Sequence, residues 1–346
     1  GAAGFIGSNF TLNWLSHSNE KIIAFDKLTY AGNLENLKSI ELNPNYIFLR
    51  GDISNSKLIA KILKEYQPRA ILNFAAESHV DRSIDGPDAF IQTNILGTYR
   101  LLQEVRNYLK DLSIELKNKF RFLHVSTDEV YGALNINDAA FKETDKYFPN
   151  SPYSATKAAS DHLVRAWHNT FYIPAITTNC SNNYGPYQFP EKLIPLCILN
   201  ALQDKDIPIY GNGKQVRDWL YVIDHCKAIE QILEKGKVGS TYNIGGNNQR
   251  TNLDIVNSIC ELLDKLKPLK NGNSYKKQIK FVKDRPGHDL RYAIDASKII
   301  DELNWKPLED FDNGIKKTVQ WYLDNLDWVE KIISGDYKNS LSKQYQ

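Results

Sequence analysis

The sequence contains no methionine, no cysteine pair spaced as CxxC, and no apolar run close to the roughly 20 residues that a membrane-spanning helix needs. Its four cysteines, Cys180, Cys197, Cys226 and Cys260, are widely separated. This spacing excludes the common zinc patterns and predicts buried thiols in a reducing cytoplasm. The formal net charge is only +2, which gives no electrostatic argument for binding to nucleic acid or to an anionic membrane.

The remaining composition is that of an ordinary globular protein. Of the 346 residues, 42% are hydrophobic and 24% are charged. At roughly 150 residues per domain, this length predicts two packed lobes. The chain becomes polar and rich in turns after residue 178. We therefore expect one domain over residues 1–178 and a second over residues 179–346, with a segment near 215–237 that packs back on the first.

The first residues form a glycine motif. Gly1, Gly4 and Gly7 are spaced as G-x-x-G-x-x-G, and helix-like apolar spacing follows them. Such a loop brings the backbone N–H groups of a helix N-terminus close to a pyrophosphate. Residues 21–25 form a predicted strand, and Asp26 follows it, about 20 residues after the motif. The Asp26 carboxylate is placed to accept hydrogen bonds from an adenosine ribose and to repel a 2′-phosphate, which favours NAD over NADP.

The chain begins inside this motif and has no initiator methionine. A dinucleotide loop normally has a strand before it as well as a helix after it. In a doubly wound sheet that strand is the central one. We therefore expect a leading segment that supplies it, and we expect a chain that truly began at Gly1 to fold poorly.

Strand-like and helical segments alternate after the motif. The predicted strands span residues 46–49, 69–74 and 120–125, and the predicted helices between them span residues 56–66 and 90–110. This alternation predicts an α/β fold with a Rossmann-type, doubly wound parallel sheet and a smaller C-terminal α/β domain.

The predicted strand at 120–125 is followed by hydroxyl groups and two adjacent acids. Ser126 and Thr127 come first, and Asp128 and Glu129 come next. Ligands bind beyond the carboxyl ends of the strands in an open parallel sheet, which favours a chemical role for these side chains. An acidic loop that caps the next helix explains the Thr-Asp-Glu triplet equally well.

Tyr153 and Lys157 are four residues apart on a predicted helix, so they share one of its faces. A free phenol has a pKa of about 10 and is a poor base at neutral pH. A nearby ammonium group and a cationic nicotinamide ring would stabilise the phenolate and lower that pKa. A surface Tyr–Lys pair has the same spacing. The chain order of dinucleotide loop, strand-end hydroxyl and Tyr–Lys pair is the one that a nicotinamide oxidoreductase needs, and it favours the functional interpretation.

Basic residues in the second half lie in polar, turn-rich segments. Lys192, Arg217 and Arg285 are predicted to clamp a diphosphate, the arginines through their bidentate forks. Surface salt bridges explain the same residues as well. His225 and His288 have no partner at metal-ligand spacing, so we expect no metal site.

These motifs resemble those of the extended short-chain dehydrogenase/reductases, and within them the nucleotide-sugar 4,6-dehydratases. The triplet Thr127–Glu129 separates such dehydratases from the sugar epimerases of the same family, which lack the acid pair. The resemblance covers nearly the whole chain through the stretches Gly1–Gly7, Asp26–Asn33, Ala75–Ile84, Ser126–Gly132, Tyr153–Lys157, Thr178–Pro195, Arg217–Val222 and Asp284–Tyr292.

The resemblance implies a hydro-lyase of deoxysugar biosynthesis that uses NAD. It implies oxidation of the sugar at C4, loss of water across C5 and C6, and reduction at C6, with dTDP-glucose converted to dTDP-4-dehydro-6-deoxy-glucose. It also implies a homodimer, and the apolar stripes of the helices at 90–110 and around Tyr153 fit either pairing across that dimer or packing on their own sheet. From the thiols and the low net charge, we expect a cytoplasmic protein without nucleic-acid or membrane partners. The residues themselves leave the choice between thymidine and uridine open.

The resemblance also implies roles for individual positions. The catalytic residues are Thr127, Asp128, Glu129, Tyr153 and Lys157. The residues that contact NAD are Gly1, Gly4, Phe5, Ile6, Gly7, Asp26, Lys27, Leu28, Thr29, Asp52, Ile53, Ala75, Ala76, Thr93, Tyr153, Lys157 and Asn183. The residues that hold the nucleotide sugar are Ser78, Thr127, Asn182, Lys192, Leu193, Pro208, Ile209, Tyr210, Arg217, Asn252, Asp284, Arg285, Pro286, Gly287 and His288.

We expect Tyr153 to remove the proton of the C4 hydroxyl, with Thr127 holding that oxygen and Lys157 keeping the phenol acidic. Glu129 then takes the C5 proton, and Asp128 protonates the departing C6 hydroxyl. The alternatives are an epimerase, a decarboxylase or another dehydratase of the same family. A non-catalytic NAD-binding protein is a further alternative, although a protein that only binds needs no acid pair.

Overall fold

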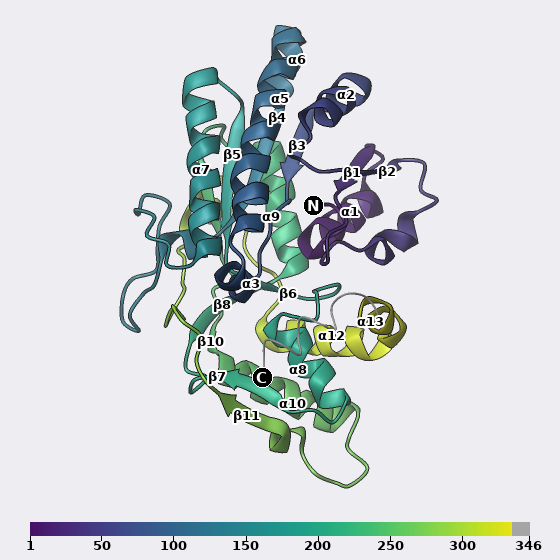
Figure 1. Cartoon of the computed structure of the whole chain (residues 1–346), viewed down its shortest axis with the longest axis vertical. Coiled ribbons are helices and arrows are strands. Elements are labelled where there is room, and N and C mark those ends of the chain that lie inside the picture. Colours follow the sequence, from purple (N-terminus) through teal and green to yellow (C-terminus); the bar gives the residue numbers. More distant parts are fainter. Residues whose placement is uncertain (334–346) are drawn as a thin grey trace.

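The structure, a computed structural model, describes residues 1–333 (Figure 1). The main sheet consists of four parallel strands in the order β3-β4-β5-β9, with bounds Ala70–Asn73, Arg121–Thr127, Ala175–Cys180 and Thr241–Ile244. Two further parallel strands, β1 (Ile22–Asp26) and β2 (Tyr46–Arg50), form a sheet of their own beside the main sheet. The predicted α/β class with a doubly wound parallel sheet is confirmed.

Helices cover both faces of the main sheet, and together they form what we call the sheet lobe. Phe122 and Leu123 are adjacent on β4 and fully buried, yet they belong to different hydrophobic cores, because successive side chains of a strand point to opposite faces. The core around Leu123 includes α1 (Phe5–His17), α9 (Val222–Lys235) and α11 (Ser297–Leu303). The core around Phe122 includes α2 (Ser56–Tyr66), α5 (Thr98–Asp111) and α7 (Pro152–Phe171).

No hydrogen-bonded ladder joins β1 to β3 within residues 1–333. An apolar cavity of about 500 Å³ lies between the two strands. Ile23 and Phe25 line it from β1, and Ile71 and Leu72 line it from β3. The parallel strands of the sheet lobe thus form two separate ladders.

The smaller C-terminal lobe lies at the other end of the molecule in Figure 1. Its core is formed mainly by α8 (Leu193–Leu202), α10 (Asn252–Leu266), α12 (Phe311–Asp324) and α13 (Leu326–Ile333). The strands of this half are β7 (Ile207–Tyr210) with β11 (Ile279–Val282), and β10 (Gln249–Thr251) with β8 (Val216–Tyr221) and β6 (Asn182–Tyr184). Shorter helical elements are η1 (Leu34–Ile40), α3 (Val80–Asp85), α4 (Asp88–Phe90), α6 (Ile114–Lys119), η3 (Asp128–Tyr131) and η4 (Tyr275–Gln278).

Helix α7 begins where its sequence provides both a cap and a proline. The Ser151 hydroxyl accepts a hydrogen bond from the Ser154 N–H, the Ser154 hydroxyl accepts one from the Ser151 N–H, and Pro152 occupies the first turn. This capping box satisfies N–H groups that lack helical partners. It places Tyr153 and Lys157 in the first two turns of α7.

The predicted helix over residues 90–110 is interrupted. After α4, residues Ile91–Gly97 form a π-helical segment, η2, and α5 begins at Thr98. Asn94 lies in η2 and is buried; its side chain bonds the N–H and the carbonyl of Glu77 and the hydroxyl of Thr156. Wide helical turns of this kind occur often at functional sites.

All four cysteines are buried thiols without a disulfide, as the sequence predicts. Among the helices of residues 1–333, none combines the length and the apolar character that crossing a bilayer requires.

Candidate active site

A cavity of about 300 Å³ opens at the carboxyl ends of β1, β3, β4 and β5. Its lining includes all five predicted catalytic residues. It also includes every predicted NAD contact except Leu28, whose φ of 57° turns the chain back so that its N–H donates to Asp26. The predicted substrate contacts Ser78, Thr127, Asn182 and Lys192 line the same cavity.

The glycine loop forms one wall of this cavity and is packed too closely for side chains. A Cβ atom at Gly7 would lie 2.2 Å from the carbonyl oxygen of Gly1, and one at Gly1 would lie 2.5 Å from the backbone nitrogen of Ala75. Such separations are far below van der Waals contact, so glycine is required at both positions. The loop therefore presents bare backbone at the N-terminus of α1, where an anion is stabilised.

Asp26 closes the other side of the loop. One carboxylate oxygen accepts a hydrogen bond from Ala3 N–H at 2.9 Å, and the other accepts one from Leu28 N–H at 2.7 Å. The carboxylate thus has a structural role in addition to lining the cavity. Farther along, Lys27 pairs with Asp52 at 2.7 Å. Burial raises the pKa of Asp52, but hydrogen bonds from Lys27 and Ser54 outweigh it and lower that pKa overall.

The strand-end triplet combines a helix cap with buried acids. The Thr127 hydroxyl accepts the N–H of Glu129 at 3.3 Å and thereby caps η3. The capping role that the sequence left open is therefore present. Asp128 is 2% exposed, and its Oδ2 has no hydrogen-bond partner among the described residues. A helix cap formed by Thr127 does not require that the carboxyl group of Asp128 be buried from solvent, and such burial is costly.

The environments of the two acids differ. Burial, Glu129 and Asp218 raise the pKa of Asp128 well above its usual value. Burial also raises the pKa of Glu129, but three cations, Arg285, Arg217 and Lys192, oppose that rise. These are the cations for which the sequence predicts a diphosphate clamp. Asp128 is thus the acid favoured to keep its proton, and Glu129 is the one favoured to lose it.

Tyr153 and Lys157 reach the cavity from α7. The Lys157 ammonium donates a hydrogen bond to the Val125 carbonyl of β4 at 2.8 Å. Burial and the acids Glu129 and Asp128 raise the pKa of Tyr153, and a hydrogen bond with Thr127 lowers it. Burial and the two acids therefore favour the neutral phenol, and positive charge near the hydroxyl would favour the phenolate.

The other predicted substrate contacts lie in the C-terminal lobe, outside this cavity. Ile209 differs from the rest because its side chain is 2% exposed and belongs to the core. Arg217 donates to the Asp289 carbonyl at 3.0 Å and lies 4.2 Å from the centre of the Tyr292 ring. His288 pairs with Asp284 at 2.6 Å. The remaining predicted contacts outside the cavity are Leu193 at the start of α8, Pro208 and Tyr210 on β7, Asn252 at the start of α10, and Arg285, Pro286 and Gly287 in the loop after β11.

The sequence predictions miss several residues of the cavity wall. Glu191 lines it, is 7% exposed, and accepts a hydrogen bond from the Tyr30 hydroxyl at 3.0 Å. Lys192, beside it, donates to the Ser78 carbonyl at 3.0 Å. The sequence signal that could have identified Glu191 is its position next to Lys192 in the segment Phe189–Pro195.

Within residues 1–333, no group of three or more His, Cys, Asp or Glu side chains is arranged to hold a metal ion.

A family model described as GDP-mannose 4,6 dehydratase matches residues 1–318. A dTDP-glucose 4,6-dehydratase of Xanthomonas campestris is 58% identical over 338 residues, which cover 98% of this chain and 96% of that protein. The chain belongs to the dTDP-glucose 4,6-dehydratase family. The family and the fold implied by the sequence resemblance are thereby confirmed.

Two solved dTDP-glucose 4,6-dehydratases share this architecture. The enzyme of Bacillus anthracis, in complex with NAD, is 47% identical, with a TM-score of 0.84 over 96% of this chain and 97% of that one. The enzyme of Streptomyces venezuelae, with NAD bound, is 42% identical, with a TM-score of 0.87 over 96% of this chain and 98% of that one.

Proposed function

We propose that this chain is an NAD-dependent dTDP-glucose 4,6-dehydratase that yields dTDP-4-dehydro-6-deoxy-glucose for deoxysugar biosynthesis. The observation that carries the proposal is the convergence of Asp128, Glu129 and Tyr153 on one cavity beside a glycine loop. A C4 epimerase needs the oxidising half of this site but has no use for a protonated acid beside an ionised one. Relatives at 58% identity carry the same activity in their name.

The residues of the cavity fit a dinucleotide. The loop at Gly1 and Gly7 admits no Cβ atom, the N-terminus of α1 faces the cavity, and the Asp26 carboxylate lies where a ribose is expected. Bound there, NAD would supply the hydride acceptor for C4 and the hydride donor for C6, and its positive nicotinamide ring would favour a phenolate at Tyr153.

The chain's own residues then move the protons. Tyr153 takes the proton of the C4 hydroxyl, and Thr127 holds the same oxygen by a hydrogen bond. A ketone at C4 makes the C5 proton acidic. Glu129 removes that proton, and Asp128, which burial keeps protonated, gives its proton to the departing C6 hydroxyl as water leaves. When C6 regains its hydride, Glu129 returns a proton to C5, which completes the product. Three cations lower the pKa of Glu129, whereas only Arg217 does so for Asp128, and this difference supports the assignment.

Lys192, Arg217 and Arg285 are the proposed contacts of the diphosphate. All three lower the pKa of Glu129, so their charges lie within electrostatic reach of that carboxylate. A diphosphate bound there would partly neutralise them and allow the pKa of Glu129 to rise toward that of a better base. Substrate binding and base strength are thus linked in this site.

The test is to incubate the protein with dTDP-glucose, and separately with UDP-glucose, at a catalytic amount of NAD. We expect a 4-keto product, visible as a chromophore in alkali, without net NADH, and faster with dTDP-glucose. A C4 epimer, released carbon dioxide or stoichiometric NADH would each contradict the proposal. Tyr153→Phe should abolish the NADH absorbance that appears transiently on mixing with substrate.

We also propose a cytoplasmic homodimer. Ile91 and Tyr99, at the start of the η2–α5 segment, are exposed at 42% and 38%, and α5 and α7 lie side by side on one face of the sheet lobe (Figure 1). Pairing of these two helices with those of a second copy would cover such side chains. Light scattering of the purified protein tests this, and a monomer at micromolar concentration would contradict it.

A further inference from the structure

Helix α7 carries a third polar residue in line with Tyr153 and Lys157. Asp161 follows Lys157 by the same interval at which Lys157 follows Tyr153, so all three side chains share one face of the helix. All three are buried, with exposed fractions of 8%, 3% and 4% in chain order. Asp161 does not line the catalytic cavity. It lines a second cavity of about 410 Å³, together with Asp145, His162 and Thr177.

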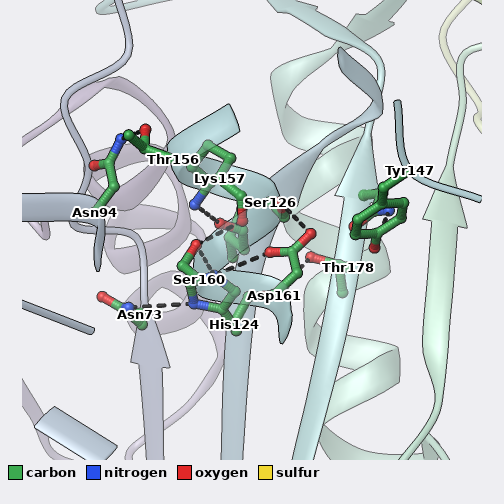
Figure 2. A network of polar contacts seen from close by, with 12 residues as sticks. Asn73, Asn94, His124, Ser126, Tyr147, Thr156, Lys157, Ser160, Asp161 and Thr178 are labelled. Atoms are coloured by element: carbon green, nitrogen blue, oxygen red, sulfur yellow. Dashed lines mark hydrogen bonds and ion pairs between the residues drawn. The ribbon is translucent and has the colours of Figure 1, made fainter. Parts of the chain in front are cut away.

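Figure 2 shows that Asp161 is held from β4. The Ser126 hydroxyl donates a hydrogen bond to Asp161 Oδ2 at 2.8 Å, and His124 Nε2 lies 3.3 Å from Asp161 Oδ1. That second oxygen has no hydrogen-bond partner of good geometry within the described residues. Burial raises the pKa of the phenols of Tyr147 and Tyr131, and the negative charge of Asp161 adds to this rise. Neither phenol brings a positive charge.

His124 does not bring one either. The Asn73 amide nitrogen can only donate, and it lies 3.2 Å from His124 Nδ1, so that ring nitrogen is the acceptor. The Ser160 hydroxyl donates to the Lys157 carbonyl at 2.7 Å and therefore accepts from His124 Nε2 at 3.1 Å. Burial and the nearby Lys157 lower the pKa of His124, which keeps the ring neutral.

Two cations, Lys146 and Arg165, line the same cavity as Asp161, but both are exposed to solvent. Lys157, one helical turn before Asp161, is buried with it and is the cation best placed to balance its charge. Burial lowers the pKa of Lys157, and Asp161 is the first of the groups that oppose this, followed by Cys180. Without Asp161, the desolvated ammonium would lose its proton more easily. A neutral Lys157 could not favour a phenolate at Tyr153.

We propose that Asp161 is a positioning residue, which keeps Lys157 charged inside the buried site and so sets the upper pH limit at which Tyr153 acts as a base. The inference rests on the roles of Tyr153 and Lys157 under the proposed function. The competing interpretation is purely structural: Asp161 would serve only as the acceptor for Ser126. The two interpretations differ in what happens to the pH dependence of C4 oxidation.

The test is Asp161→Asn, which keeps the shape of the side chain and removes its charge. C4 oxidation is followed as the NADH absorbance that appears on mixing holoenzyme with dTDP-glucose, over a range of pH. We expect the alkaline limb of this profile to move to lower pH by about one unit or more. Asp145→Asn is the matched control, because Asp145 lines the same cavity but is exposed; its profile should match the parent. A folded Asp161→Asn protein with an unmoved alkaline limb would overturn the proposal.

Asp161→Ala provides a second test, because the space that it opens adjoins the 410 Å³ cavity. Formate should enter this space and restore the alkaline limb, whereas neutral formamide should not. Equal effects of the two compounds, or failure of both variants to fold even in formate, would assign Asp161 to folding alone. Measurements on the parent protein and on Tyr153→Phe distinguish a failure of this inference from a failure of the proposed function. If the parent produces no transient NADH, or if Tyr153→Phe still produces it, the proposed function itself is wrong.

Discussion

Arg285 and Asp81 form an ion pair that joins the two lobes, with 3.1 Å between Arg285 Nη1 and Asp81 Oδ1. Asp81 lies on α3 beside the catalytic cavity, and Arg285 lies in the loop after β11. The Tyr210 hydroxyl donates to the other oxygen of Asp81 at 3.2 Å. Asp81 thus fixes two proposed substrate contacts before substrate arrives, and a contact fixed in advance loses less entropy on binding.

Asp81→Asn should therefore weaken substrate binding rather than chemistry. We expect KM for dTDP-glucose to rise by about tenfold, the size of one charge-assisted hydrogen bond, with little change in kcat. Steady-state kinetics at saturating NAD measure both constants. Asp85→Asn, on the exposed end of the same helix, is the control. A lower kcat at unchanged KM would show that Asp81 acts on the chemical steps instead.

Asp128→Asn should separate oxidation from elimination. Tyr153 and Thr127 remain, so C4 oxidation should proceed, but loss of the general acid should slow water loss by about 10²- to 10⁴-fold. Bound NADH should then accumulate during turnover, seen by its absorbance, while the 4-keto-6-deoxy product forms slowly. Parent-like water loss would remove Asp128 from the proposed role.

The same Asp128→Asn change should stabilise the fold at neutral pH. Burial raises the pKa of Asp128 well above its ordinary value of 3.8. Below about pH 4 the carboxyl is protonated in both the folded and the unfolded chain and contributes no difference. As pH rises further, the unfolded chain gains stability by releasing this proton while the folded chain resists its release. The excess unfolding free energy of the variant over the parent should therefore grow as the pH rises above about 4. Urea denaturation measures this difference, and a constant or shrinking difference would contradict the prediction.

Gly7→Ala should impair NAD binding, because the added methyl group would lie 2.2 Å from the Gly1 carbonyl oxygen and must displace the loop. We expect the affinity for NAD to fall by about tenfold or more, the usual scale of overpacking, measured by titration calorimetry. At Gly86 a Cβ atom would have its nearest neighbour 3.9 Å away, so Gly86→Ala should bind NAD as the parent does.

Local sequence predicts much of this molecule. The strand predicted at 120–125 corresponds to β4 (Arg121–Thr127), whose burial on both faces explains why this segment is mainly apolar. The interval between Tyr153 and Lys157 is enough to place them on one helical face. Both lie on the wall of the predicted cavity, although their chemical roles stay predictions.

Other features depend on contacts that no local pattern contains. The role of Asp161 rests on packing of α7 against Ser126 and His124 of β4, which lie some 35 residues earlier. Successive side chains of β7 point to opposite faces of the strand, and only the tertiary core shows that the Ile209 side chain lies on the buried face. The interruption of the 90–110 helix likewise reflects the bonds of Asn94 to Glu77 and Thr156 rather than local propensity.

The outermost strand of the main sheet, β9, enters the sheet only after the chain has passed through the C-terminal lobe, and α9 and α11 pack on the same face. A cut near residue 178 would therefore strip one edge and much of one layer from the nucleotide-binding half. Neither half is a free-standing module. Heat or denaturant should melt both in a single transition, and fragments expressed apart should regain structure only when mixed.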